Sequence, residues 1–360
     1  MRGLIQIETL AEGQQRAEDV GARLVEFLDG ATKSLEIALY DVRLPGEVGD
    51  RVAGALRAAA KRRVQTRLLY NVDHARRIPI PAPPNTKPEL IEALPFPTLP
   101  IPGDPDLMHH KYVVRDGNTV WSGSTNWTLD SWQRQENAIV TLASRAVAAA
   151  FAHNFDELWE TRKVDHSGFG DPDEIDVDAA KVRVWFCPGH GRALAHRIAD
   201  AIDHASHVRI ASPVISSGPI LGTLAQVISD RRADVAGVVD ATQIAQVLEQ
   251  WDENGNGEWK YPLLACVIAD GRFTGKHSTP YRIGSVHDYM HAKITVADDT
   301  TFVGSFNLSR SGEFNAENVL EIQDAHIARH FAEYIDAIRA RFPALPAAPP
   351  LTPGPGRQRP

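Results

Sequence analysis

A short segment of the sequence gathers side chains that are able to do chemistry together. His109 and Lys111 are two positions apart in a run that predicts a strand, so both point to one face of it. Asp116 and the glycine after it predict a hairpin turn, and the returning strand brings Ser124 and Asn126, again two positions apart. A neutral imidazole can attack an electrophilic centre and a protonated one can donate a proton to a leaving group. Ammonium and amide groups can neutralise anionic oxygens.

The same arrangement returns about 180 residues later. In both copies a glutamate follows ten residues after the asparagine, namely Glu136 and Glu317. The glycine of the second copy comes one residue sooner after the aspartate, and a hairpin shortened by one residue explains this difference. Such a pattern at two corresponding places indicates an internally duplicated chain. The motif residues of the second copy are His291, Lys293, Asp298, Ser305 and Asn307.

The doubled pattern resembles the signature of the phospholipase D superfamily, which is His-x-Lys, four residues, Asp, about six residues and Gly-Ser-x-Asn. The resemblance covers essentially residues 1–342. It implies two copies that face each other across a pseudo-two-fold axis, build one site and cleave a phosphodiester without a metal or another cofactor. It also implies that His109 and His291 are the nucleophile and the general acid, with His109 as the nucleophile that forms a phosphohistidine. One histidine near its ordinary pKa cannot do both at once, so two are required.

The other motif residues are expected to support these two histidines. The lysines and asparagines suit the neutralisation of phosphodiester oxygens. The glutamates are expected to accept a hydrogen bond from the far ring nitrogen of a histidine and fix its tautomer. The serines are expected to hold phosphate or backbone, the aspartates to be scaffold, and His110 to pack on the opposite face of the strand. These pairs are Lys111 and Lys293, Asn126 and Asn307, Glu136 and Glu317, Ser124 and Ser305, and Asp116 and Asp298.

The segments around the motifs predict an α/β fold. Each half opens with an amphipathic helix and a β-branched strand and closes with another helix, while short apolar runs alternate with helical patterns between them. We therefore expect two duplicated domains, each a mixed β-sheet flanked by helices. The matching helix and strand are expected at 20–28 and 35–39 in the first half and at 196–202 and 208–215 in the second, with closing helices at 151–158 and 331–338.

Composition shifts suggest where the domains end. Acidic residues mixed with glycine and proline predict an exposed linker at 166–180, between a first domain at 1–165 and a second at 181–342. The Pro-rich stretch 343–360 predicts a disordered tail. Residues 79–105 hold ten prolines, which exclude a regular helix or a central strand. A long loop of this kind borders a site about as often as it is a packed surface excursion.

Charge and hydropathy restrict the partners. The chain has 360 residues and a formal net charge of −8, which disfavours a non-specific coat on duplex DNA but leaves a local basic cleft open. No run of 18 apolar residues predicts a transmembrane helix, and no signal peptide is visible. The expectation is a cytoplasmic protein, peripheral at a membrane, or a secreted one if a signal was removed before Met1. Since both motifs lie in one chain, a monomer is sufficient.

The motifs specify the bond to be cleaved, and three interpretations of the substrate stay open. The first is phospholipid hydrolysis or transphosphatidylation, including chemistry like that of cardiolipin synthase or hydrolase, which the acidic balance and the apolar loop 79–105 favour. The second is a metal-independent nuclease, in which Trp121, Trp127 and Trp132 would stack on bases unless they lie in the core. The third, a binding scaffold without activity, is disfavoured because both motifs retain every reactive group.

Overall fold

Two sheets form the framework of the molecule. The structure, a computed structural model, describes residues 3–72, 86, 91–103, 106–254, 257, 259–280 and 285–348. The first sheet runs in the order β1 (Ile5–Leu10), β9 (Asn137–Ala143), β7 (Thr119–Gly123), β6 (Lys111–Arg115), β2 (Ser34–Leu39), β4 (Gln65–Val72) and β5 (Thr98–Pro102). The second runs in the order β10 (Ile175–Val177), β11 (Ala180–Phe186), β17 (Asn318–Gln323), β16 (Thr300–Gly304), β15 (Ile294–Ala297), β12 (His207–Ser212), β13 (Asp234–Asp240) and β14 (Phe273–Lys276).

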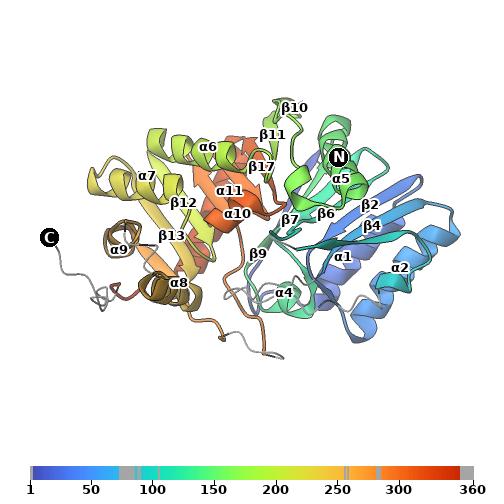
Figure 1. Cartoon of the computed structure of the whole chain (residues 1–360), viewed down its shortest axis with the longest axis horizontal. Coiled ribbons are helices and arrows are strands. Elements are labelled where there is room, and N and C mark those ends of the chain that lie inside the picture. Colours follow the sequence, from blue (N-terminus) through green and yellow to red (C-terminus); the bar gives the residue numbers. More distant parts are fainter. Residues whose placement is uncertain are drawn as a thin grey trace.

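The two strand orders coincide once β10 is set aside. In the first sheet β2, β4 and β5 are parallel neighbours and the other pairs are antiparallel, and β12, β13 and β14 repeat this in the second. Figure 1 shows the two halves side by side, the first in blue and cyan and the second in yellow to red. The predicted α/β architecture of duplicated mixed sheets flanked by helices is therefore confirmed.

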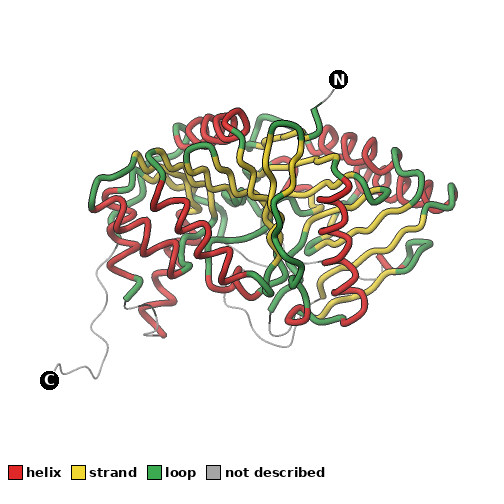
Figure 2. Tube along the Cα trace, turned by 90° about the horizontal axis from the view of Figure 1, so that it is seen from above, coloured by secondary structure: helices red, strands yellow, loops and turns green. Residues whose placement is uncertain are grey.

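Helices cover the outer face of each sheet, and one helix from each half lies in the central core between the sheets (Figure 2). The outer helices of the first half are α1 (Ala17–Asp29) and α2 (Gly46–Lys61). Those of the second half are α6 (Gly191–His204), α7 (Gly218–Ser229), α8 (Ala241–Asn254) and α9 (Tyr261–Asp270). The inner helices are α5 (Arg145–Thr161) and α11 (Ala325–Arg339), which share one hydrophobic cluster with strands of both sheets.

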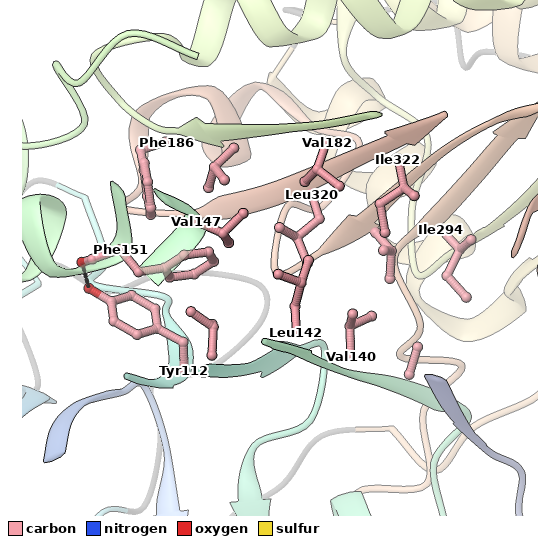
Figure 3. Close-up of a cluster of buried hydrophobic side chains, with 14 of the residues drawn as sticks. Tyr112, Val140, Leu142, Val147, Phe151, Val182, Phe186, Ile294, Leu320 and Ile322 are labelled. Carbon is pink, nitrogen blue, oxygen red and sulfur yellow. Dashed lines mark hydrogen bonds between the residues drawn. The ribbon is translucent and has the colours of Figure 1, made fainter. Parts of the chain in front are cut away.

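The sequence of α5 explains why it lies between the sheets. Its buried residues Val147, Phe151 and Phe155 recur every four positions, which aligns them on one face of a helix. The Phe151 ring meets Tyr112 of the first sheet at 4.9 Å and Phe186 of the second at 5.1 Å, in both cases edge to face (Figure 3). Burial of one such ring stabilises the fold by roughly 1.5–3 kcal/mol. The central core thus fixes one half of the chain against the other.

The secondary structure bears on several expectations. The predicted helices lie within α1, α5, α6 and α11, and the predicted strands 35–39 and 208–215 coincide with β2 and, in most of its length, with β12. The expected linker 166–180 contains the short strand β10, which pairs with β11. Within the described residues, no helix is long and apolar enough to cross a membrane. The domain boundaries themselves stay predictions.

Two Pro-rich segments differ from expectation. The backbone of Leu345 donates to Phe273, and Gly275 donates to Pro343, so the first residues of the expected disordered tail 343–360 are bonded to β14. Residues 349–360 lie outside the described part of the chain. In the expected loop 79–105, residues 98–102 form β5, an edge strand beside β4, where proline is tolerated because only one side of the strand is paired. Residues 79–85, 87–90 and 104–105 are outside the described residues.

Candidate active site

One aspartate fastens each motif hairpin to its sheet. Asp116 adopts a φ of +54° in the turn between β6 and β7, and its carboxylate accepts from the backbone N–H groups of Thr32, Lys33 and Ser34 at 2.6–3.1 Å. Burial raises the pKa of Asp116, but these hydrogen bonds outweigh it and leave the pKa lowered. Asp298 has a φ of +48° and accepts in the same way from two backbone groups at the start of β12. The carboxylates of both aspartates are thus bonded to backbone groups, as the expected scaffold role requires.

The histidines stand where the two halves meet. The backbone N–H of His109 donates to Ala316 at 2.9 Å, and that of His291 donates to Glu136 at 3.2 Å, so each histidine is bonded to the opposite half. The Nζ of Lys111 donates to the carbonyl of His109 at 2.6 Å, and Lys293 does the same to His291 at 2.6 Å. The predicted histidines and lysines are therefore brought together into one site by the junction of the halves.

Burial and mutual repulsion disfavour positive charge in this site. Burial lowers the pKa of His109 and His291 well below the usual range, and the neighbouring lysines lower both further. Burial also lowers the pKa of Lys111 to about 7 and that of Lys293 well below its usual range, with Lys111 adding to the effect on Lys293. An anion that entered here would stabilise the charged forms of all four groups.

The ring nitrogens of the two histidines have different partners. The Nδ1 of His109 lies 2.8 Å from Oε2 of Glu317, whereas the Nδ1 of His291 lies 3.0 Å from Oδ1 of Asn137. Burial raises the pKa of Glu317 to about 7, while Lys111 and hydrogen bonds from Ser305 and Asn315 lower it. Both contacts cross between the halves and occupy Nδ1, which leaves Nε2 as the ring nitrogen for chemistry.

The amide of Asn137 is fixed in one orientation. Its Nδ2 donates to the carbonyl of Ser131 at 3.0 Å, and its Oδ1 accepts from the hydroxyl of Ser124 at 2.7 Å. The oxygen therefore faces His291, whose Nδ1 must carry the proton of that hydrogen bond. A neutral amide fixes the tautomer without adding a negative charge. The partner of His109, by contrast, is a carboxyl group.

The expected role of Glu136 needs correction. The Ser124 N–H donates to the carbonyl of Ala138, whereas the Ser305 N–H donates to that of Asn318, so the first half has one more residue between motif and return strand. The extra residue follows the short helix α4 (Leu129–Gln133), whose counterpart is α10 (Arg310–Phe314). Asn137 consequently takes the place that Glu317 has in the other half, and among the described residues Glu136 bonds to no histidine.

The serines, asparagines and His110 complete the set. Each serine hydroxyl accepts from the return strand, Ser124 from Ala138 and Ser305 from Asn318. In the described structure, Oδ1 of Asn126 and of Asn307 is buried and has no hydrogen-bond partner, so each is available to a ligand. His110 is fully buried with its ring 5.0 Å from that of Tyr112 and 6.1 Å from that of Phe186, which agrees with the expected packing role.

Sequence reasoning missed two residues beside the first motif. The ring of Tyr40 meets His109 edge to face at 4.5 Å and lies 4.8 Å below Nζ of Lys111. Asp41 is buried nearby, and burial raises its pKa to about 6 although Lys111 lowers it. The signal was an aspartate two residues after the end of the buried strand β2, where the second half has Val214 two residues after the end of β12.

Comparisons with known proteins agree with this geometry. A family model described as "Cardiolipin synthase, PLD-like domain" matches residues 24–159 and 198–339, which is once in each half. Among curated proteins, mitochondrial cardiolipin hydrolase of Xenopus laevis is 29% identical over 39% of this chain and 60% of its own length. Mitochondrial cardiolipin hydrolase of Chlamydomonas reinhardtii is 23% identical over 39% of this chain and 58% of its own length. The match thus spans less than two thirds of these relatives.

Solved structures show the same fold over more than nine tenths of the chain. Phosphatidylserine synthase of Haemophilus influenzae matches with a TM-score of 0.66 and 13% identity over 93% of this chain and 86% of its own. Polyphosphate kinase of Porphyromonas gingivalis matches with a TM-score of 0.58 and 12% identity over 94% of this chain and 47% of its own. With the family model matching both halves, the chain belongs to the phospholipase D-like family.

Proposed function

We propose that the protein cleaves phospholipid phosphodiesters through a covalent phosphohistidine. The observation that supports this most is the pair of cross-half contacts, which hold His109 and His291 by Nδ1 and leave both Nε2 atoms for chemistry. Lys111 and Lys293 lie beside them, with lowered pKa values that an anionic phosphodiester would raise. Asn126 and Asn307 add amide groups to this anion site.

The first step forms the covalent intermediate. The Nε2 of His109 attacks phosphorus, the bond from phosphorus to the leaving oxygen breaks, and His291 gives its Nε2 proton to that oxygen. The phosphorylated ring of His109 then carries a positive charge, which the Glu317 carboxylate stabilises through Nδ1–H. Because an anionic substrate raises the pKa of His291, binding itself favours the protonated imidazole that this step needs.

The second step releases the product. The Nε2 of His291, now neutral, takes a proton from water or an alcohol as that oxygen attacks phosphorus, and the bond from phosphorus to His109 breaks. His291 is thereby protonated again, and the cycle closes. His109 is 4% exposed whereas His291 is partly exposed, which favours His291 as the group that exchanges protons. The burial of His109 and its carboxyl partner favour it as the nucleophile.

Surface features and the relatives favour a lipid substrate. Trp259 is 58% exposed, and Lys260 beside it donates to the carbonyl of Ser216, whose own N–H donates to Leu308, the residue after the second motif. Burial lowers the pKa of Lys260, and the exposed Arg310 lowers it further. An exposed indole beside cations suits the surface of an anionic membrane. The named relatives act on cardiolipin, an anionic phospholipid, and we extend that substrate class to this chain.

The nuclease alternative loses its strongest support. Trp121, Trp127 and Trp132 are 6%, 3% and 1% exposed and belong to the hydrophobic core beneath α1 and α2, so they are not available to stack on bases. Of the two possibilities that the sequence left open for these tryptophans, core packing is the one observed. DNA hydrolysis is therefore an outcome of the test below and not a second proposal.

The test compares lipid and DNA in one assay that contains EDTA. Purified protein, H109A and H291A are incubated with cardiolipin vesicles plus ethanol, and in parallel with single-stranded DNA. We expect lipid products from the wild type only, with each variant reduced roughly 10³-fold or more. Phosphatidylethanol among the products would show transfer to alcohol. DNA fragments that depend on His109, without lipid turnover, would refute the lipid substrate, and near wild-type rates in both variants would refute the mechanism.

A further inference from the structure

A buried ion pair joins the two halves beside the second histidine. Glu136 is fully buried, and its Oε2 lies 2.9 Å from Nζ of Lys276, the last residue of β14. The same ammonium donates to the carbonyl of Arg134 at 2.9 Å and lies 3.1 Å from a carboxylate oxygen of Glu12. Lys276 belongs to the second half and its three partners belong to the first. The cluster therefore ties β14 to the segment that leads into β9.

The strand registers identify the counterpart of Lys276 in the other half. Asp240 pairs with Lys276 across β13 and β14, and Asn71 pairs with Ile101 across β4 and β5. Asp240 and Asn71 correspond, because each accepts a hydrogen bond from the backbone N–H of the methionine that precedes its motif histidine. Ile101 therefore occupies the position of Lys276, and it is fully buried in the central core.

The counterpart of Glu136 is apolar as well. The carbonyl of Ala316 accepts from the backbone of His109 just as that of Glu136 accepts from His291. Ala316 is fully buried in the same central core as Ile101. One half thus uses two apolar residues where the other half uses a buried ion pair. Since burial of two ions costs about as much as their attraction returns, stability alone does not account for the pair.

The difference coincides with the difference in histidine partners. On the side of Ala316, the next residue is Glu317, whose hydrogen bond to His109 can be charge-assisted and strong by itself. On the side of Glu136, the next residue is Asn137, which offers His291 only a neutral hydrogen bond. The ion pair stands one residue before this weaker contact and restrains the same segment of backbone.

We propose that Lys276 and Glu136 are positioning residues that hold Asn137 against His291, an inference that rests on the proposed role of His291 as general acid. The ionic contact between the halves is made by Glu136, one residue before the residue that bonds to His291. His291 consequently keeps a fixed ring orientation while its partner bears no charge, so its proton can leave and return. The ion pair acts on the leaving-group proton through Asn137 and does not touch the substrate.

Leaving groups of different basicity separate this role from a structural one. p-Nitrophenolate departs without a proton, whereas the alkoxide released from cardiolipin needs one. We expect K276M and E136Q to lower kcat/KM about tenfold with cardiolipin and less than about twofold with phosphatidyl-p-nitrophenol. The ratio kcat/KM covers formation of the intermediate, so the later hydrolysis step does not obscure the comparison. H291A sets the largest leaving-group preference that loss of the acid can produce.

A double variant guards against loss of folding. E136A/K276I copies the apolar pair of the other half, and we expect the wild-type denaturation midpoint together with the same selective loss on cardiolipin. R209M serves as the control, because Arg209 forms ion pairs with Asp234 and Asp336 within the second half only. It should change both substrates equally or not at all. Equal losses on both substrates in K276M, or wild-type rates in E136A/K276I, would overturn the proposal. Equal losses in H291A would instead refute the role of His291.

Discussion

The regions around His109 and His291 have the same frame but different chemical surroundings. The methionine before each histidine donates its backbone N–H to a side chain near the end of a strand, which is Asn71 of β4 or Asp240 of β13. A lysine donates to the carbonyl of each histidine, and each Nδ1 contacts the opposite half. One extra residue after α4 replaces the carboxyl partner by an amide and moves the glutamate to Lys276. A shift of one residue in a duplicated fold therefore gives two equivalent histidines different hydrogen-bond partners, without altering either motif.

Replacement of the carboxyl partner of His109 by an amide would test this comparison most strongly. The pKa of Glu317 is raised to about 7, so its carboxylate is present above that pH and is protonated below it. We expect kcat/KM of the wild type to fall as the pH drops below about 7. E317Q should lower kcat/KM about 10²-fold or more at pH 8 and lack this acid limb, because the amide cannot titrate. The measurement is a pH profile of kcat/KM from pH 5 to 9.

The opposite replacement, of the amide partner of His291 by a carboxylate, tests the same difference between the two histidines. N137D gives His291 a carboxylate, which raises the pKa of its imidazole and should extend activity toward higher pH. An E317Q profile that kept the wild-type acid limb would show that another group titrates there. An N137D profile that coincided with the wild type would show that the amide is not what separates the two histidines.

A smaller effect on proton binding is expected at Lys111 and Lys293, whose hydrogen bonds are alike in the two halves. Lys111 has a pKa of about 7, so it is largely neutral at pH 8 before a ligand binds, and burial together with Lys111 lowers the pKa of Lys293 well below its usual range. Binding of inorganic phosphate should raise both values and draw up to about one proton per lysine from the buffer. Isothermal titration in two buffers of different ionisation enthalpy measures this uptake. K111M should reduce it, and binding without proton uptake would contradict the lowered pKa values.

Local spacing predicted much of this site. The hairpins, the turn aspartates and the shorter second turn follow from the motif itself, and β15–β16 is indeed closed by two residues where β6–β7 has three. The motif spacing does not reveal that Asn137, and not Glu136, is the residue that contacts His291. A Glu-Asn pair stands ten residues after the motif asparagine in both halves. The two sequences therefore align without a gap, although the strands that follow differ in register by one residue.

Contacts between segments that are distant in sequence could not be predicted from the sequence either. Lys276 lies 15 residues before His291, and nothing around it in the sequence indicates a partner in the first half. The packing of α5 and α11 between the two sheets brings β14 to Glu136, and only the assembled fold contains that information. Asp41 has a similar status, because its closeness to Lys111 depends on the order of β2 and β6 in the sheet.

The two turn aspartates give the smallest contrast between the halves. Asp116 accepts from three backbone N–H groups and from the hydroxyl of Thr32, whereas Asp298 accepts from the N–H groups of Ser206 and His207. Asparagine tolerates the positive φ of both positions, so D116N and D298N test the carboxylates without adding backbone strain. We expect the free energy of unfolding to fall by about 1–2 kcal/mol in D116N and by about 0.5–1 kcal/mol in D298N, measured by urea denaturation at pH 7.

The pH dependence of D116N completes that prediction. Because the pKa of Asp116 is lowered in the folded state, its stabilising contribution is fully present above the unfolded pKa of about 3.9 and is lost as the pH falls through the folded value. The wild type and D116N should therefore differ at pH 7, and the difference should shrink once the pH falls below the unfolded value and through the folded one. A difference that stayed constant throughout acid titration would show that the shape of the side chain, and not its charge, fastens the first hairpin to β2.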